Sequence, residues 1–186
     1  LVRIFLAAVA REWCKGLFIT TGISGRPVNV IPADGEVLAL LRERHNFAGY
    51  IHVKMVPGAQ EAQIERLTSL ATRVSLNLEA PCGDSLARIA PEKNLSQTLV
   101  SLERVRSRVN ERRAEEREGR PRDALHPGGT AGMTMQFVVG ATPDTDRTIL
   151  GKVSQLYAGR GIHHTHFAAF RPIRGTPLEN VRATPA

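Results

Sequence analysis

The sequence has 186 residues, of which 42% are hydrophobic and 23% charged, values typical of a globular domain that can bury a core. Its net charge of +7 favours anionic partners without deciding the fold. The two cysteines, Cys14 and Cys82, form no CxxC pair, which argues against a disulfide scaffold and favours a reducing, cytoplasmic location. No apolar run approaches the ~20 residues that a membrane span requires.

The chain is predicted to open with an amphipathic helix and then to alternate strands with helices. Apolar residues recur at helical spacing at the start of the chain, at Ile4, Phe5, Ala8, Val9 and Trp13. Strands are predicted at residues 16–21, 49–58, 74–81, 133–142 and 163–173. Helices are predicted at residues 35–46 (with Asp34 as N-cap), 59–73, 85–89, 96–118 and 143–161. Loops rich in Gly and Pro are predicted at residues 22–32 and 119–132.

This alternation predicts an α/β fold with a parallel sheet, because β-α-β units join parallel strands through right-handed crossovers. A doubly wound dinucleotide-binding sheet is disfavoured, since no GxGxxG motif follows a first strand. Polar residues stand instead at the carboxyl ends of the predicted strands: Thr20, Thr21, His52, Lys54, Asn77, Glu79 and Gln136. Barrel enzymes bind their ligands at that edge of the sheet. We therefore expect a partial (β/α) TIM-type barrel of about five parallel strands with a ligand site at one edge.

Several stretches, taken in order, resemble the motifs of the radical S-adenosylmethionine (SAM) superfamily. They are "GLFITTGISG", "VSLNLEAP", "QFVVGATPDTD" and "FAAFRPIRGTPLEN". With "GYIHVKMVPGA" and "LARIAPEKN" added, the pattern most resembles the radical SAM proteins associated with DNA modification or repair, whose genes are linked to uracil-DNA-glycosylase-like ones. The resemblance extends from the first helix to the last strand.

The resemblance implies a SAM site with three parts, for the amino acid, the ribose and the adenine of the cofactor. The residues implied are Thr20, Thr21, Gly22 and Lys54 for the amino acid, Ser75, Asn77 and Glu79 for the ribose, and Gln136 and Gly140 for the adenine. It also implies a [4Fe–4S] cluster, an electron donor such as flavodoxin or ferredoxin, and DNA or another nucleic acid as partner.

The sequence departs from the family in one respect, because the CxxxCxxC loop that binds the cluster is not present. Cluster ligation needs closely set thiolates, and Cys14 and Cys82 do not form such a set. The resemblance therefore implies that residues 1–186 are an internal part of a radical SAM barrel. In that interpretation the first strand with its cluster loop and the C-terminal region lie outside the sequence, and the catalytic residues are unknown.

Two other functions remain compatible with the residues. Lys54 could act as the Schiff-base lysine of an aldolase-like barrel enzyme. Alternatively, the Arg-rich half of the helix at residues 96–118 could contact phosphates in a non-catalytic nucleic-acid-binding module, with Arg112 and Arg113 opposite its apolar stripe. The "HHTH" sequence at residues 163–166 is a weak metal motif, since it has no neighbouring carboxylate or thiolate.

Overall fold

The computed structural model of the protein describes residues 1–20, 27–118, 132–158 and 162–182. Its centre is a five-stranded sheet in which every neighbouring pair is parallel and the strand order is the order of the sequence. The strands are β1 (Gly16–Thr20), β2 (Tyr50–Lys54), β3 (Arg73–Ser75), β4 (Gly132–Val139) and β5 (Ile162–Ala169). The predicted α/β fold with about five parallel strands is confirmed.

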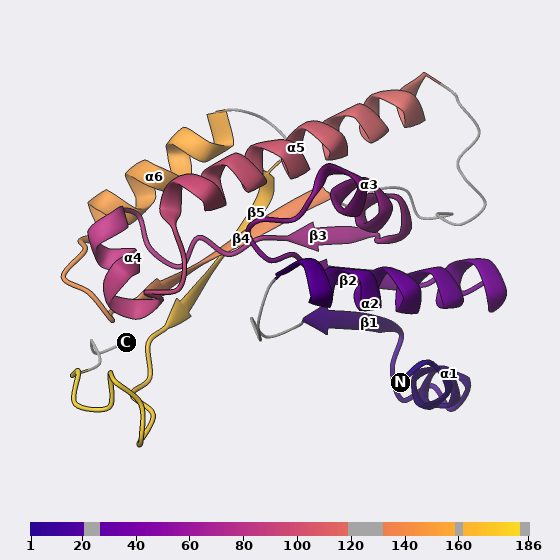
Figure 1. Ribbon diagram of the computed structural model, residues 1–186, viewed down its shortest axis with the longest axis horizontal. Coiled ribbons are helices and arrows are strands. Elements are labelled where there is room, and N and C mark those ends of the chain that lie inside the picture. The colour runs from indigo at the N-terminus through magenta and orange to yellow at the C-terminus, as the bar shows by residue number, and fades with distance from the viewer. Residues whose placement is uncertain (21–26, 119–131, 159–161, 183–186) are drawn as a thin grey trace.

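Helices connect successive strands and pack on one face of the sheet (Figure 1). They are α1 (Val2–Ala10), α2 (Pro27–Ala39), a π-helical turn η1 (Leu40–Arg44), α3 (Glu61–Leu70), α4 (Gly83–Ile89), α5 (Leu95–Arg117) and α6 (Asp146–Ala158). Figure 1 shows α1 at the β1 end of the sheet and α6 at the β5 end. No helix in these ranges is long and apolar enough to cross a membrane.

The core lies between the sheet and the helices. Alternate strand residues such as Ile51, Val53 and Phe137 are fully buried there, as the two-residue period of a strand dictates. The helices contribute the apolar stripes that their spacing predicts, including Leu38 and Leu41, Ile64 and Leu67, and Leu102 and Val105. Since the apolar residues of each strand face the helices, the other residues of the strand face the opposite side of the sheet.

Two predictions about the second helix are wrong. A loop was expected as far as Pro32, but α2 begins at Pro27, and a proline is tolerated in the first turn of a helix because the N–H it lacks would have no partner there. Asp34 was expected to cap the helix, but it lies inside α2 and is buried, with 6% of its surface exposed. The Pro, Asn and Gly content of this segment suggested a loop, although the backbone is helical.

The third strand is shorter than predicted. Regular pairing ends at Ser75, and the chain returns to β4 only through a bridge between Glu79 and Phe137. Glu79 has a φ of +66°, in the left-handed region that few residues other than glycine adopt. Its N–H donates to the carbonyl of Gln136 (3.0 Å), and its own carbonyl accepts from the N–H of Val138 (2.8 Å). The irregular backbone of residues 76–79 therefore remains attached to β4.

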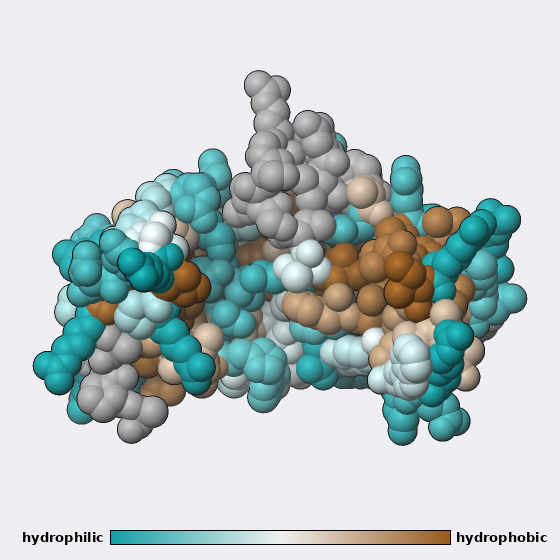
Figure 2. All heavy atoms as spheres, turned by 90° about the horizontal axis from the view of Figure 1, so that it is seen from below, coloured by the Kyte–Doolittle hydropathy of each residue, from teal (hydrophilic) through white to brown (hydrophobic). Residues whose placement is uncertain are grey.

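The first helix is confirmed, but part of its expected inward face is exposed. Phe5 is buried, whereas Ile4 is 75% exposed and Trp13, which follows the helix, is 77% exposed. Figure 2 shows apolar atoms gathered at the end of the molecule where α1 lies. Helical spacing alone therefore identified the helix correctly but not which of its apolar residues are buried.

Candidate functional site

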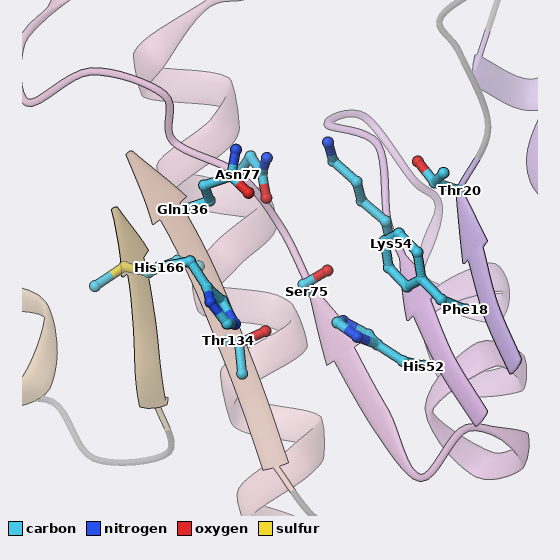
Figure 3. Close-up of a pocket in the computed structure, with 10 residues that line it drawn as sticks. Phe18, Thr20, His52, Lys54, Ser75, Asn77, Thr134, Gln136 and His166 are labelled. Carbon is cyan, nitrogen blue, oxygen red and sulfur yellow. The ribbon is translucent and has the colours of Figure 1, made fainter. Parts of the chain in front are cut away.

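The face of the sheet opposite the helices carries a hollow of about 380 Å³. This volume is within the range of small-molecule sites in proteins. All five strands, with the segment that follows β3, contribute to its lining: Phe18, Thr20, His52, Lys54, Ser75, Asn77, Thr134, Met135, Gln136 and His166 (Figure 3). Most of these residues alternate along their strands, as expected for side chains that share one face.

The register of the strands arranges the lining in rows across the sheet. Thr20, Lys54, Ser75 and Thr134 form a middle row, because each is paired with the next across adjacent strands. A lower row, nearer the amino ends of the strands, contains Phe18 and His52, and the register continues it to Arg73, which is not among the lining residues. An upper row pairs Gln136 with His166, and Figure 3 shows Asn77 beside Gln136. Thr20, Lys54 and Ser75 are the last residues of β1, β2 and β3, so the middle row lies at the carboxyl ends of these strands, where the sequence predicted the site.

The polar side chains that line the hollow have no hydrogen-bond partner in the part of the chain that the structure describes. Eight of the ten lining residues are polar, and none of these eight side chains makes a hydrogen bond to any residue that the structure describes. Thr134 is only 1% exposed, yet its hydroxyl has no partner in the described part of the chain. Buried polar groups are normally hydrogen-bonded, so these donors and acceptors are suited to a polar ligand or to water.

His52 belongs to the lower row and lines the hollow. The pKa of His52 is lowered from 6.5 to about 4, first by burial and then by the charges of Arg73 and His166. The pKa of His166 is also lowered, first by burial and then by His164 and Arg73. Both imidazoles are therefore neutral at pH 7, and the Nε2 atom of His52 is buried without a hydrogen-bond partner among the described residues.

The structure brings together five of the nine residues that the sequence assigned to a SAM site. Thr20, Lys54, Ser75, Asn77 and Gln136 all line the hollow. Thr21 and Gly22 lie outside the described residues. Glu79 and Gly140 are not among the lining residues, although both follow strands that contribute to it.

Glu79 contacts a lysine rather than the hollow. The Nζ atom of Lys93 lies 2.7 Å from Oε1 of Glu79, and each side chain is only 12% exposed. The two-residue strand period predicted that Glu79 would face the same side as Asn77. Because the backbone at Glu79 turns into the left-handed region, this period no longer applies.

Five residues that line the hollow were not assigned to SAM from the sequence: Phe18, His52, Thr134, Met135 and His166. His52 had been placed with the polar strand-end residues of the expected ligand site, but without a role of its own. Phe18 and Thr134 stand two residues before Thr20 and Gln136 and could have been found from the two-residue strand period.

Two histidines of β5, His164 and His166, lie close together. The rings of His164 and His166 lie 4.5 Å apart, but no group of three or more His, Cys, Asp or Glu residues that could hold a metal ion occurs among the described residues. A [4Fe–4S] cluster fits this chain no better. Cys14 precedes β1 and Cys82 follows β3, so they lie toward opposite ends of parallel strands.

Helix α5 was considered as a phosphate-binding surface, and many of its charges are paired. Arg106 forms an ion pair with Glu103, and Arg108 forms ion pairs with Glu65 and Glu111. The prediction that Arg112 and Arg113 lie opposite the apolar stripe is wrong, because both side chains are partly buried. Burial lowers the pKa of Arg113, and Nε of Arg112 is inaccessible to solvent.

Comparison with known proteins supports one class of fold. The chain has an α/β fold in which five parallel strands alternate with helices, as in a partial (β/α) barrel. A solved structure with this fold is HydG, a maturase of the [FeFe]-hydrogenase, which matches with a TM-score of 0.67 and 14% sequence identity. The match covers 100% of this chain and 38% of the HydG chain, so this chain spans less than half the length of HydG. No protein-family model and no curated protein matches the sequence.

Proposed function

We propose that this chain is the SAM-binding part of a radical SAM enzyme. SAM then occupies the hollow on the inner face of the sheet, which is the face opposite the helices. One observation carries the proposal: eight polar side chains converge on one hollow, and none is engaged by the residues that the structure describes. The sequence motifs that resemble the superfamily contribute Thr20, Ser75, Asn77 and Gln136 to this hollow. The fold shared with HydG gives independent support.

The chemical character of the lining suits the groups of SAM. The ammonium of Lys54 can neutralise a carboxylate, and it forms no ion pair with any described residue. The amides of Asn77 and Gln136 can each donate and accept, as vicinal hydroxyls and an adenine edge require. When bound and reduced, SAM supplies a 5′-deoxyadenosyl radical. The role of this chain is to bind and orient the cofactor and to keep water from it.

The residues of this chain do not fit the iron–sulfur cluster of the class. A cluster requires several closely set thiolates, whereas the sequence has two cysteines located toward opposite ends of the sheet. We therefore assign no step of the reaction to a cluster held by these residues. The electron for cleavage of SAM would have to come from a redox partner, for which flavodoxin or ferredoxin is the expected class.

The finer part of the proposal is that the substrate is a nucleic acid and that the reaction modifies or repairs DNA. Its support is the motif pattern and the net charge of +7, which attracts polyanions. A reaction on DNA requires a cytoplasmic protein, which agrees with the location that Cys14 and Cys82 favour.

The two alternatives have less support. A Schiff-base enzyme that uses Lys54 needs acid–base groups beside the lysine, and no carboxylate is among the described lining residues. A module that binds nucleic acid only through α5 would leave the polar hollow without a role. Trapping of a carbonyl ligand on Lys54 by borohydride is expected to fail, and success would favour the Schiff-base enzyme.

The proposal is tested by SAM binding measured with isothermal titration calorimetry. Asn77→Ala removes an amide that points into the hollow, and its loss should weaken SAM binding by about 1–3 kcal/mol, the scale of a buried polar contact. Asn110→Ala on α5, far from the lining, is the matched control and should bind SAM as the unaltered protein does. Equal affinities in both variants, with folding verified by circular dichroism, would remove Asn77 from the site. Absence of binding by the unaltered protein would refute the proposal itself.

A further inference from the structure

The lower half of the hollow has a different chemical character from the upper half. The upper row presents the neutral amides of Asn77 and Gln136, whereas the lower row presents the imidazole of His52. Arg73 is paired with His52 across β2 and β3, although it is not itself among the residues that line the hollow. Figure 3 shows His52 and His166 pointing toward one another from opposite walls, with Ser75 and Thr134 between them. Two ligand groups of different kinds could therefore occupy the two halves.

Arg73 is a fixed positive charge beside His52, at the lower border of the hollow. Its register pairing with His52 places it on the inner face, and its charge lowers the pKa of both His52 and His166. The Cζ atom of Arg73 lies 5.9 Å from the ring centroid of Tyr50, so the guanidinium is in cation–π contact with this ring. No ion pair or hydrogen bond joins Arg73 to any residue in the described ranges, and its Nε atom is buried without a partner.

Two further polar groups lie on the strands that flank Arg73. His52 Nε2 on β2 and the hydroxyl of Thr134 on β4 are buried and, like Arg73 Nε, have no hydrogen-bond partner among the described residues. Lys54 adds a second fixed positive charge one row above Arg73. None of the described lining residues is acidic. Glu79 is the acidic residue nearest in sequence to a lining residue, Asn77, and it forms an ion pair with Lys93.

These features favour an anionic ligand over a metal cation or an apolar group. A metal cation is disfavoured because Arg73 and Lys54 repel it and no carboxylate is present to balance its charge. An apolar group would leave buried donors unsatisfied, at a cost in free energy for each of them. An oxyanion accepts hydrogen bonds from a guanidinium, a hydroxyl and an imidazole N–H, and these charge-assisted bonds are the strongest of their kind.

We propose that Arg73, His52 and Thr134 form a binding site for an oxyanion, a phosphate or carboxylate group of the substrate, in the lower half of the hollow below SAM. The inference rests on the proposed function only in identifying the bound molecule as the substrate of the enzyme. The oxyanion site itself follows from Arg73 and its neighbours. It assigns a second ligand to a hollow whose upper half is assigned to SAM.

The test uses inorganic phosphate and acetate as probes, each titrated into the protein in chloride buffer. Binding is measured by calorimetry and by the NMR shifts of the His52 and His166 ring protons. Arg73→Gln should weaken binding of the preferred probe at least about tenfold, the effect of losing a charge-assisted hydrogen bond. Its affinity for SAM should stay within about twofold of the original, because Arg73 is below the SAM half. Arg88→Gln, an exposed arginine on α4, is the matched control and should change neither affinity.

A second variant makes the test independent of the folding of Arg73→Gln. Thr134→Val keeps the shape of a buried residue whose hydroxyl has no partner, so the variant should fold as stably as the original. It should nevertheless weaken binding of the probe severalfold. Unchanged probe affinity in both Arg73→Gln and Thr134→Val overturns the oxyanion site.

The remaining outcomes separate the two proposals. If SAM displaces the probe and Lys54→Met abolishes probe binding while Arg73→Gln does not, the anion occupies the carboxylate position of SAM and the inference is wrong. If SAM binds but neither probe does, the inference fails and the proposed function stands. If the probe binds through Arg73 and SAM does not bind, the oxyanion site stands and the proposed function fails.

Discussion

At the scale of single residues, Arg42 shows how one buried cation can hold several segments together. It is 1% exposed and lies in the π-helical turn η1. Its guanidinium donates to the carbonyls of Leu70 (2.9 Å), Gly49 (2.8 Å) and Phe47, and to the hydroxyl of Thr72 (3.1 Å). These partners come from the ends of α3 and the segments flanking β2. Arg42 therefore satisfies carbonyls that would otherwise be buried without donors.

Arg42→Met should destabilise the protein by about 2–4 kcal/mol, because the methionine fills much of the space but leaves several buried acceptors without donors. Arg44→Met, two residues away on an exposed position, should change stability by less than about 0.5 kcal/mol. Urea unfolding followed by circular dichroism measures both. A small effect of Arg42→Met would mean that water replaces the guanidinium at little cost.

His52 gives a prediction for the pH dependence of stability. Its pKa is lowered from 6.5 to about 4 in the folded protein, so the unfolded chain binds a proton at a higher pH than the folded protein does. The resulting stabilisation is present above pH 6.5 and is lost as the pH falls from 6.5 to about 4. Because the ring is partly solvated, we expect about 1–2 kcal/mol rather than the full value of the shift.

His52→Gln should reduce the loss of stability over this pH interval. Comparison of urea unfolding at pH 7 and pH 4.5 isolates its contribution, since the carboxylates titrate in both proteins. Identical pH profiles for the two proteins would show that His52 is protonated at its ordinary pKa in the folded state.

At the scale of secondary-structure elements, the ion pair between Glu79 and Lys93 ties the irregular end of β3 to the segment before α5. Lys93→Met should destabilise the protein by about 1–3 kcal/mol, because it leaves the largely buried carboxylate of Glu79 unpaired. The double variant Glu79→Gln with Lys93→Met should recover part of this loss, since no charge is then left unpaired.

The exposed pair of Arg66 and Glu43 serves as the control. Its nitrogen and oxygen lie 2.8 Å apart, close to the 2.7 Å of Lys93 and Glu79, but its side chains are 50% and 47% exposed. Arg66→Met should therefore cost less than about 1 kcal/mol. Equal losses for Lys93→Met and Arg66→Met would contradict a special role for burial in the first pair.

These same elements show which features the sequence could predict. The order of strands and helices follows from apolar periods of 2 and 3.6 residues, which are local properties of the chain. The inner-face residues Thr20, Lys54 and Asn77 were found because they stand at strand ends. Glu79 was misplaced because its backbone conformation depends on bridging to β4, more than fifty residues away in the sequence. The position of Arg73 beside His52 depends likewise on the register of two strands.

At the scale of the whole molecule, the placement of the cysteines leads to a prediction about iron. Cys14 and Cys82 lie toward opposite ends of the sheet, so they cannot bind one cluster together. The chain, treated anaerobically with iron and sulfide, should not assemble a stoichiometric [4Fe–4S] cluster. Absorbance near 400 nm, roughly where such clusters absorb, and an EPR signal after reduction measure this. A full cluster signal would show that the two cysteines meet between chains or that other ligands contribute.

The distribution of positive charge leads to the last prediction, which concerns DNA. A net charge of +7 predicts some affinity for any duplex, whereas a phosphate-binding α5 predicts that the position of the charges matters. On α5, Arg104 and Arg117 are exposed and form no ion pair with a described residue, unlike Arg106 and Arg108. They are therefore better placed than Arg112 and Arg113 to meet phosphates.

The double reversal Arg104→Glu with Arg117→Glu should weaken duplex binding and flatten the slope of log K against log salt by roughly two units, one for each lost contact. The control reverses Arg3 and Arg11 at the α1 end of the molecule, and both are exposed. Each double variant removes two positive charges and adds two negative ones, so both lower the net charge of +7 by the same amount. Fluorescence anisotropy over a series of salt concentrations compares them. If the two variants lose affinity and slope equally, DNA responds to the overall charge of the protein, and α5 is a solvated helix with no separate role in binding.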